Sequence, residues 1–193
     1  RMKEYAEALG YGVASGIELP GEMTGLVPDP QWKRINAGEI WATGDTYIAS
    51  MGQGYVLSTP MQVLVSFATL ANDGKMMQPT LIREIQDAEG NVIQPFSPEL
   101  KSDITVDPVI EIYDEDNQAT GEFRSIDPFV IEMAKEGMRL VVMDGGTVHK
   151  EFAEFDQIVQ SAGKTGTAEY CDDIANEKGL CQRGSWPTHP WYA

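Results

Sequence analysis

The most regular pattern of apolar residues in the chain follows Thr59 and predicts a buried helix. Thr59 is a favourable N-cap, Pro60 suits the first helical position, and Gln62 can complete a capping box with Thr59. Apolar residues then recur at helical spacing, at Leu64, Phe67, Ala68 and Ala71. Gly74 supplies the signal that ends the helix.

Two other segments have helical spacing. Residues 2–9 predict the end of an amphipathic helix, and the glycines and prolines of residues 10–30 predict an irregular surface connection after it. A third helix is expected to begin with Asp127 as its N-cap and to end at the turn of residues 144–147. Its apolar face would contain Val130, Ile131, Ala134, Met138, Val141 and Val142.

The alternation of apolar and polar residues predicts strands. Residues 81–85 and 92–96 flank a glycine-containing turn, which is the pattern of a β-hairpin. Residues 97–125 are acidic and weakly periodic, so we expect a solvated excursion with one short strand near residues 109–113. Residues 155–167 are predicted to form a strand, with Ile158 and Val159 as its apolar core.

A polar loop is expected over residues 170–190. Taken in order, the predicted elements indicate an α/β fold of the α+β type, with an antiparallel sheet flanked by helices.

Composition excludes some classes of function. The chain has 193 residues and a formal net charge of −16, and a surface this acidic repels phosphate backbones, so no nucleic-acid partner is expected. The most apolar stretch, residues 61–71, is too short to cross a membrane. If the protein is membrane-anchored, we expect the anchor to lie outside this chain.

The sharpest candidate for chemistry is Lys164-Thr165-Gly166-Thr167. A phosphate-binding loop would require a glycine at position 158, which is Ile158, so no nucleotide or other cofactor is expected. On an edge strand beside a cleft, a lysine and a threonine hydroxyl can hold a substrate carboxylate. A glycine there lets substrate lie against the strand, whose backbone N–H groups can help to form an oxyanion hole.

The two cysteines, Cys171 and Cys181, have three interpretations. They can be free thiols, or they can form a local disulfide that closes a loop, which we favour for a chain outside the cytoplasm. A zinc site that adds Asp172, Asp173 or His189 is the third, but no metal-binding spacing supports it, so no metal is expected.

Several segments resemble one family in the family's own order. They are residues 16–22 (Gly-Ile-Glu-Leu-Pro-Gly-Glu), 41–46 (Trp-Ala-Thr-Gly-Asp-Thr), 50–54 (Ser-Met-Gly-Gln-Gly), 59–62 (Thr-Pro-Met-Gln), 71–74 with Pro79, 163–168 (Gly-Lys-Thr-Gly-Thr-Ala) and 189–192 (His-Pro-Trp-Tyr). Jointly they resemble the elongation-type class B penicillin-binding proteins, the penicillin-binding protein 2 group.

This resemblance implies a penicillin-binding and serine β-lactamase-like transpeptidase fold, and a peptidoglycan D,D-transpeptidase that works through an acyl-serine intermediate. Lys164, Thr165 and Thr167 would hold the carboxylate of a D-alanyl-D-alanine stem peptide or of a β-lactam, and Gly166 would keep the strand open. The resemblance also implies the extracytoplasmic face of a bacterial membrane and a membrane-embedded glycan polymerase as partner.

Two of the family's three catalytic motifs are absent from the chain. The only Ser-x-x-Lys runs from Ser161 to Lys164 and overlaps the Lys-Thr-Gly strand, and no Ser-x-Asn occurs. We therefore expect residues 1–193 to be the C-terminal portion of one transpeptidase domain, incomplete, with a truncated final strand and with its nucleophile serine outside the chain. A sheet edge left open would favour homo-oligomers.

Other functions remain open at this point. The chain could belong to a non-catalytic module that senses β-lactams or muropeptides, or to a purely structural domain. A serine β-lactamase is a further enzyme alternative, although residues 41–46 and 52–62 argue against it.

Overall fold

The structure, a computed structural model, describes residues 2–116, 118–182 and 186–193. The chain divides into two compact units, Arg1–Glu132 and Met133–Ala193. Both combine helices with antiparallel strand pairs, so the predicted mixed α+β class is confirmed.

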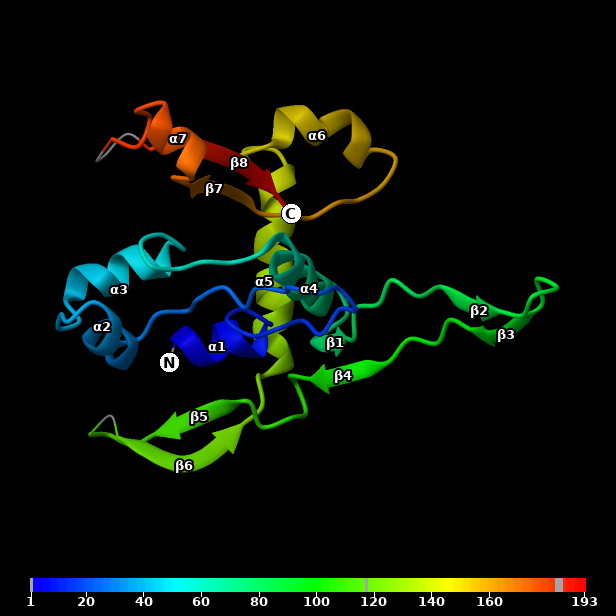
Figure 1. The fold of residues 1–193 in the computed structure, drawn as a ribbon, viewed down its shortest axis with the longest axis horizontal. Helices are drawn as coiled ribbons and strands as arrows, with labels where there is room; N and C mark the ends of the chain where they lie inside the picture. The colour runs from blue at the N-terminus through cyan, green and yellow to red at the C-terminus, as the bar shows by residue number, and fades with distance from the viewer. Residues whose placement is uncertain (1, 117, 183–185) are drawn as a thin grey trace. The chain divides into compact units, whose positions relative to one another are not determined.

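Seven helices and eight strands lie in the described part of the chain (Figure 1). The helices are α1 (Met2–Ala8), α2 (Pro30–Asn36), α3 (Thr43–Ser50), α4 (Pro60–Ala71), α5 (Pro128–Val142), α6 (His149–Asp156) and α7 (Asp173–Glu177). The strands are β1 (Lys75–Met77), β2 (Glu84–Gln86), β3 (Val92–Pro95), β4 (Leu100–Asp103), β5 (Ile110–Tyr113), β6 (Ala119–Arg124), β7 (Thr165–Glu169) and β8 (Thr188–Tyr192). Over the described residues they form four separate antiparallel pairs: β1–β4, β2–β3, β5–β6 and β7–β8.

Helix α4 begins as predicted, at a complete capping box. The Gln62 N–H donates to Thr59 Oγ1 at 3.2 Å, and the Thr59 N–H donates to Gln62 Oε1 at 3.0 Å. The predicted apolar face is wrong, however, because Leu64 is 61% exposed while Gln62 is fully buried. The Gln62 amide donates to Val13 O at 2.8 Å and to Thr24 O at 2.7 Å. The buried face of α4 is therefore partly polar, since it must satisfy carbonyls of an irregular connection.

The core of the first unit is a small cluster of buried side chains. Its members are Ala8, Ile104, Ile110, Ile126 and Ile131. Ile104 is completely buried. Its N–H donates to Gly74 O at 3.0 Å, and its carbonyl accepts the Ile126 N–H at 2.8 Å. Within residues 97–125 the predicted strand near residues 109–113 is confirmed as β5, and most of the segment is exposed as expected. The prediction missed β4, β6 and the burial of Ile104 and Ile110, because these strands are short and isolated isoleucines among acidic residues leave no visible period.

The irregular connection of residues 10–30 is confirmed, and side chains hold it in place. The Glu22 carboxylate accepts the N–H groups of Ser15 and Gly16 at 2.7 and 3.0 Å. Hydrogen bonding by the Ser15 side chain, and then by these N–H groups, holds the pKa of Glu22 below its ordinary value. Lys101 donates to Ser15 O at 2.8 Å, and Gln78 donates to Gly16 O at 2.9 Å. Side-chain bonds therefore replace the ladder that a regular element would supply.

A buried lysine connects α2 and α3. Lys33 is 6% exposed, and its ammonium lies 3.0 and 2.8 Å from the two carboxylate oxygens of Asp45 and 3.1 Å from Glu39. Asp45 also accepts the Ala42 N–H at 2.6 Å. The Asp45 hydrogen bond raises the pKa of Lys33, and Lys33 in turn lowers the pKa of Asp45.

The structure follows the prediction at the start of α5 and departs from it between α6 and β7. Helix α5 begins at Pro128 with Asp127 accepting the Phe129 N–H at 2.9 Å, as expected. The predicted strand over residues 155–167 is wrong, because α6 runs to Asp156 and β7 begins only at Thr165. Ile158, its supposed core, is 83% exposed.

The predicted polar loop of residues 170–190 contains α7 and the first part of β8. In the part of the chain that the structure describes, no helix has the length and apolar character needed to span a membrane.

Replacing Gln62 with alanine should destabilise the chain by about 2–4 kcal/mol, because two carbonyls and one N–H would lose their partner in a buried place. Urea unfolding of residues 1–193, followed by circular dichroism, measures this change. Leu64→Ala on the exposed face of the same helix is the control and should cost less than about 1 kcal/mol. Equal losses in the two variants would contradict the buried polar face.

Candidate functional site

Strand β7 begins with Thr165, Gly166 and Thr167 of the Lys-Thr-Gly-Thr segment and lies beside β8 (Figure 1), and Lys164 immediately precedes it. The two strands pair in register, with Thr165 opposite Tyr192 and Thr167 opposite Pro190. Lys164 extends the ladder by one residue, because it exchanges both backbone hydrogen bonds with Ala193, at 2.8 and 3.2 Å. The structure therefore places all four predicted site residues on one continuous stretch of strand.

The register decides which backbone groups face β8. In an antiparallel ladder only alternate residues bond the partner strand, and the Lys164–Ala193 pair sets that alternation. Gly166 is thereby a bonded residue, whereas Thr165 and Thr167 direct their backbone groups toward the opposite edge. Pro190, which has no N–H, lies opposite Thr167, where β7 requires no donor.

The side chains of the site divide between the two faces and the edge of β7. Thr165 and Thr167 share one face because successive strand residues alternate. Thr165 is half-buried, while Lys164, Gly166 and Thr167 are exposed. The Lys164 ammonium donates to Thr165 O at 2.6 Å, so the cation lies against the edge of the strand rather than away from it. A cation and hydroxyl groups on so short a segment suit a carboxylate ligand.

Two glycines of the site have different structural roles. A Cβ on Gly163 would lie 2.6 Å from Ala193 O and closer still to the ring of Tyr192, so no side chain fits there. A Cβ on Gly166 would meet only Trp191 Cβ, at 3.8 Å, which is an ordinary contact. The fold therefore requires glycine at position 163. At position 166 the described residues leave room for a side-chain carbon.

An ion pair holds the segment that leads into β7. Arg139 of α5 donates to both carboxylate oxygens of Asp156, each at 2.6 Å, and also to Ser161 O at 2.8 Å. The Ser161 N–H donates to Asp156 Oδ1 at 3.1 Å, and the Gly163 N–H donates to Met138 O at 3.1 Å. Residues 157–163 have no regular structure, so these bonds determine where the strand starts.

The same contacts set the electrostatics around the strand. Hydrogen bonds from Arg139 and from the Ser161 N–H hold the pKa of Asp156 below its ordinary value, and Asp156 raises the pKa of Arg139. Burial, with the nearby charge of Asp156, raises the pKa of the Tyr192 hydroxyl. The ring of Tyr192 lies 4.7 Å from that of Phe152, so β8 is packed against α6. One weak signal of this support is present in the sequence, because Arg139 is a cation in the last turn of an apolar helix.

Ser161 and Lys164 do not form a nucleophile and its base. The hydroxyl of Ser161 is buried, and both its backbone groups are bonded to the Arg139–Asp156 pair. The ammonium of Lys164 is bonded to Thr165 O instead.

The cysteines lie just beyond the strand and are joined. Cys171 and Cys181 form a disulfide with an S–S distance of 2.08 Å. Of the three interpretations of this pair, the structure corresponds to the local disulfide. His189 stacks on Tyr170 with ring centroids 4.2 Å apart. Among the described residues no group of three or more potential ligands could hold a metal ion.

The chain is similar to one family of known proteins over most of its length. A family model described as the penicillin binding protein transpeptidase domain matches residues 1–187. The chain is 33% identical over 180 residues to the peptidoglycan D,D-transpeptidase MrdA of Haemophilus influenzae, a match that covers 92% of this chain and 24% of that protein. The chain thus spans about a quarter of the length of the curated relatives that it matches over most of its own length.

Solved structures are similar over most of the chain. A structure described as the structural coordination of polymerization and crosslinking by a peptidoglycan synthase complex matches with a TM-score of 0.62 and 31% identity, covering 93% of this chain and 24% of that one. Pseudomonas aeruginosa PBP2 in complex with WCK 5153 matches with a TM-score of 0.59 and 28% identity, covering 86% and 32%. These likenesses confirm the resemblance and the fold predicted from the sequence.

The two glycines can be separated by substitution. Gly163→Ala should destabilise residues 1–193 by about 1–3 kcal/mol and accelerate amide exchange at Lys164 and Ala193, because the methyl group overlaps Tyr192. Gly166→Ala, the control, should leave both within error. Unfolding titrations and hydrogen–deuterium exchange measure the effects, and equal behaviour of the two variants would refute the assignment.

Stability should depend on pH through Asp156. Its folded-state pKa is depressed, so its contribution is complete above the unfolded value of about 4 and is lost as pH falls through the folded value. The stability difference between the wild type and Asp156→Asn should therefore be constant from about pH 5 to pH 7 and shrink below about pH 4.

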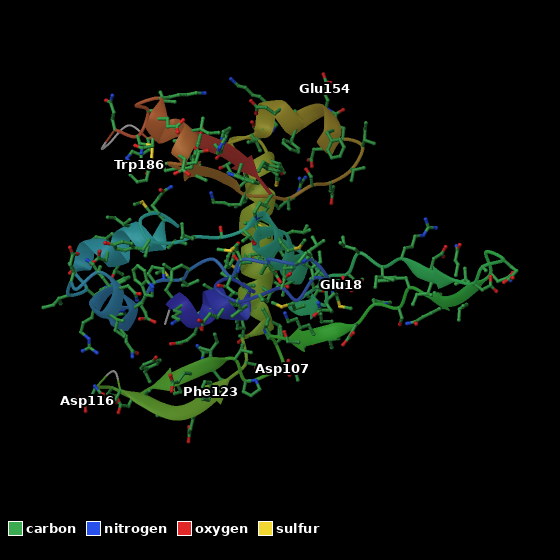
Figure 2. All side chains as sticks on the ribbon, viewed as in Figure 1. Glu18, Asp107, Asp116, Phe123, Glu154 and Trp186 are labelled. Atoms are coloured by element: carbon green, nitrogen blue, oxygen red, sulfur yellow. A yellow bond between two sulfur atoms is a disulfide. The ribbon has the colours of Figure 1, made fainter. Side chains whose placement is uncertain are left out.

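Urea unfolding at several pH values measures this difference. Glu154→Gln is the control on the same helix, since Glu154 projects into solvent (Figure 2), and should change stability by less than about 0.5 kcal/mol. A difference for Asp156→Asn that grows toward low pH would contradict the ion pair.

Proposed function

Because the chain belongs to the penicillin-binding protein transpeptidase domain family, we propose that it is the part of a peptidoglycan D,D-transpeptidase that supplies the substrate-binding strand. The observation that carries this proposal is the placement of Thr165, Gly166 and Thr167 at the start of β7, with Lys164 paired to Ala193 immediately before it. The substrate is a D-alanyl-D-alanine stem peptide, and a β-lactam binds in its place.

The role of the strand is to hold the terminal carboxylate of the substrate. The Lys164 ammonium supplies a positive charge at the edge, and the hydroxyls of Thr165 and Thr167 donate hydrogen bonds to the carboxylate oxygens. Binding requires Lys164 to exchange its bond to Thr165 O for the ligand, which a charge-assisted bond to an anion favours. With the carboxylate fixed, the scissile amide or lactam carbonyl lies at a defined place along the strand.

Gly166 contributes because it has no side chain. A side chain there would project from the face opposite the two threonine hydroxyls and would add bulk beside the edge along which an extended peptide can lie. Since the protein leaves this space open, the backbone of an extended peptide can lie close to β7.

The acyl-serine chemistry requires groups from outside this chain. We assign the nucleophile to the serine of a Ser-x-x-Lys motif elsewhere in the transpeptidase domain, and residues 1–193 to the C-terminal portion of that domain. Ser161 is unsuited to the role, because its hydroxyl is buried and its backbone is held by Arg139 and Asp156. The chain by itself is therefore not expected to be catalytic.

The setting of the protein follows from the same proposal. Cross-linking of stem peptides takes place on the extracytoplasmic side of the membrane, so the complete protein would be anchored there. A relative of 31% identity is described in a peptidoglycan synthase complex that coordinates polymerization and crosslinking. By analogy, a membrane glycan polymerase is the proposed partner.

Removal of the Lys164 ammonium tests the proposed role. In the complete protein, Lys164→Ala should lower the second-order rate of acylation by a fluorescent penicillin about 100-fold, because the carboxylate loses its charged partner. Gel fluorescence against time measures the rate.

Lys150→Ala, which removes an exposed ammonium from α6, is the matched control and should react at the wild-type rate. A folded Lys164→Ala variant that also reacts at the wild-type rate would refute the role. Release of cross-linked product, measured separately, distinguishes a transpeptidase from a sensor that is acylated without turnover.

A further inference from the structure

The disulfide lies at the end of the substrate-binding strand. The last registered residue of β7 is Glu169, opposite Thr188, and the Tyr170 N–H still donates to Pro187 O at 3.1 Å. Cys171 follows at once and is four residues beyond Thr167. In Figure 2 the yellow disulfide bond lies beside α7, near Trp186. The covalent link therefore begins where the backbone ladder stops.

The segment closed by the disulfide is a short, self-contained turn of helix. Cys171 and Cys181 are ten positions apart, with their Cα atoms 5.7 Å apart, and α7 lies between them. Asp172 caps α7 by accepting the Ala175 N–H at 2.7 Å. After the helix, the Leu180 N–H donates to Ala175 O at 2.9 Å. A helix of five residues has little stability of its own, so the disulfide and this cap keep the segment folded.

The strand is thus held at both ends by different means. Before Lys164 it is held by the Arg139–Asp156 ion pair, and after Glu169 by the stacked rings of Tyr170 and His189 and by the disulfide. The residues between these ends are mostly exposed and pair along one edge with β8. Loss of the second anchor would widen the range of conformations of β7 at Thr167 without disturbing the first.

We infer that the Cys171–Cys181 disulfide positions the substrate-binding strand, so that its reduction weakens the first, non-covalent capture of a carboxylate ligand. This inference rests on the proposed function of β7. Cys171 is exposed, so a dithiol reductant can attack it. One dithiol supplies two electrons and two protons; its sulfurs become a disulfide, and Cys171 and Cys181 become thiols.

The test uses the complete protein with and without dithiothreitol, and a count of free thiols confirms reduction. Acylation by a fluorescent penicillin is followed over a range of concentrations, which separates the dissociation constant of the first complex from the rate constant of acylation. On reduction the dissociation constant should rise about fivefold to tenfold while the acylation constant changes by less than about twofold, because an ordering cost is added to binding alone.

The double variant Cys171→Ser with Cys181→Ser is the control for the reductant. Without dithiothreitol it should have the binding constant of the reduced wild type, and dithiothreitol should not change it further. A merely structural disulfide would lower the fraction of protein that reacts and leave both constants unchanged. That outcome, or a dissociation constant unaltered after complete reduction, would overturn the inference.

Hydrogen–deuterium exchange separates this inference from the proposed function. Reduction of the wild type should accelerate exchange over residues 165–169 and leave residues 60–71 of α4 unaffected. If Lys164→Ala shows that β7 does not bind the carboxylate, the proposed function fails, but the exchange result still decides whether the disulfide holds the strand. Unchanged exchange over residues 165–169 would sink the inference even if Lys164 has its proposed role.

Discussion

The ion pair of Arg139 with Asp156 is the interaction on which the candidate site depends. The segment between α6 and β7 forms neither helix nor strand, so the start of the strand is positioned by these two side chains, the backbone of Ser161 and the backbone bond from Gly163 to Met138. The side chains are 27% and 19% exposed, which shields the pair from solvent more than a surface ion pair is shielded. Two parallel bonds also fix direction, which a single contact could not do.

Features that depend on neighbouring residues were predictable from the sequence. The cap of α4, the N-terminus of α5 and the β2–β3 hairpin follow from signals within a few positions of one another. Features that depend on distant residues were not. The burial of Gln62 is set by carbonyls 38 and 49 positions away, and that of Ile104 by four other segments of the chain. Ile158 shows the opposite case, an apolar residue whose local pattern suggested a strand and which is exposed.

The candidate site divides along the same line. Its chemistry could be recognised from the types and order of residues 164–167, because a cation and hydroxyls next to a glycine are the groups that suit a carboxylate ligand. Its orientation could not, because the register with β8 and the reach of Tyr192 over Gly163 arise only when the two strands meet. The support from Arg139 lay 17 positions from Asp156 and had no motif of its own.

Pro190 has a consequence for how this strand pair can be extended. Since it lies at a position of β8 that is not bonded to β7, its ring nitrogen belongs to the far edge of β8, where a third strand would pair. One carbonyl of that third strand would lack a hydrogen-bond donor, because Pro190 has no N–H to offer it. A sheet built outward from β8 would therefore be one hydrogen bond weaker at Pro190 than at its other outward-facing residues.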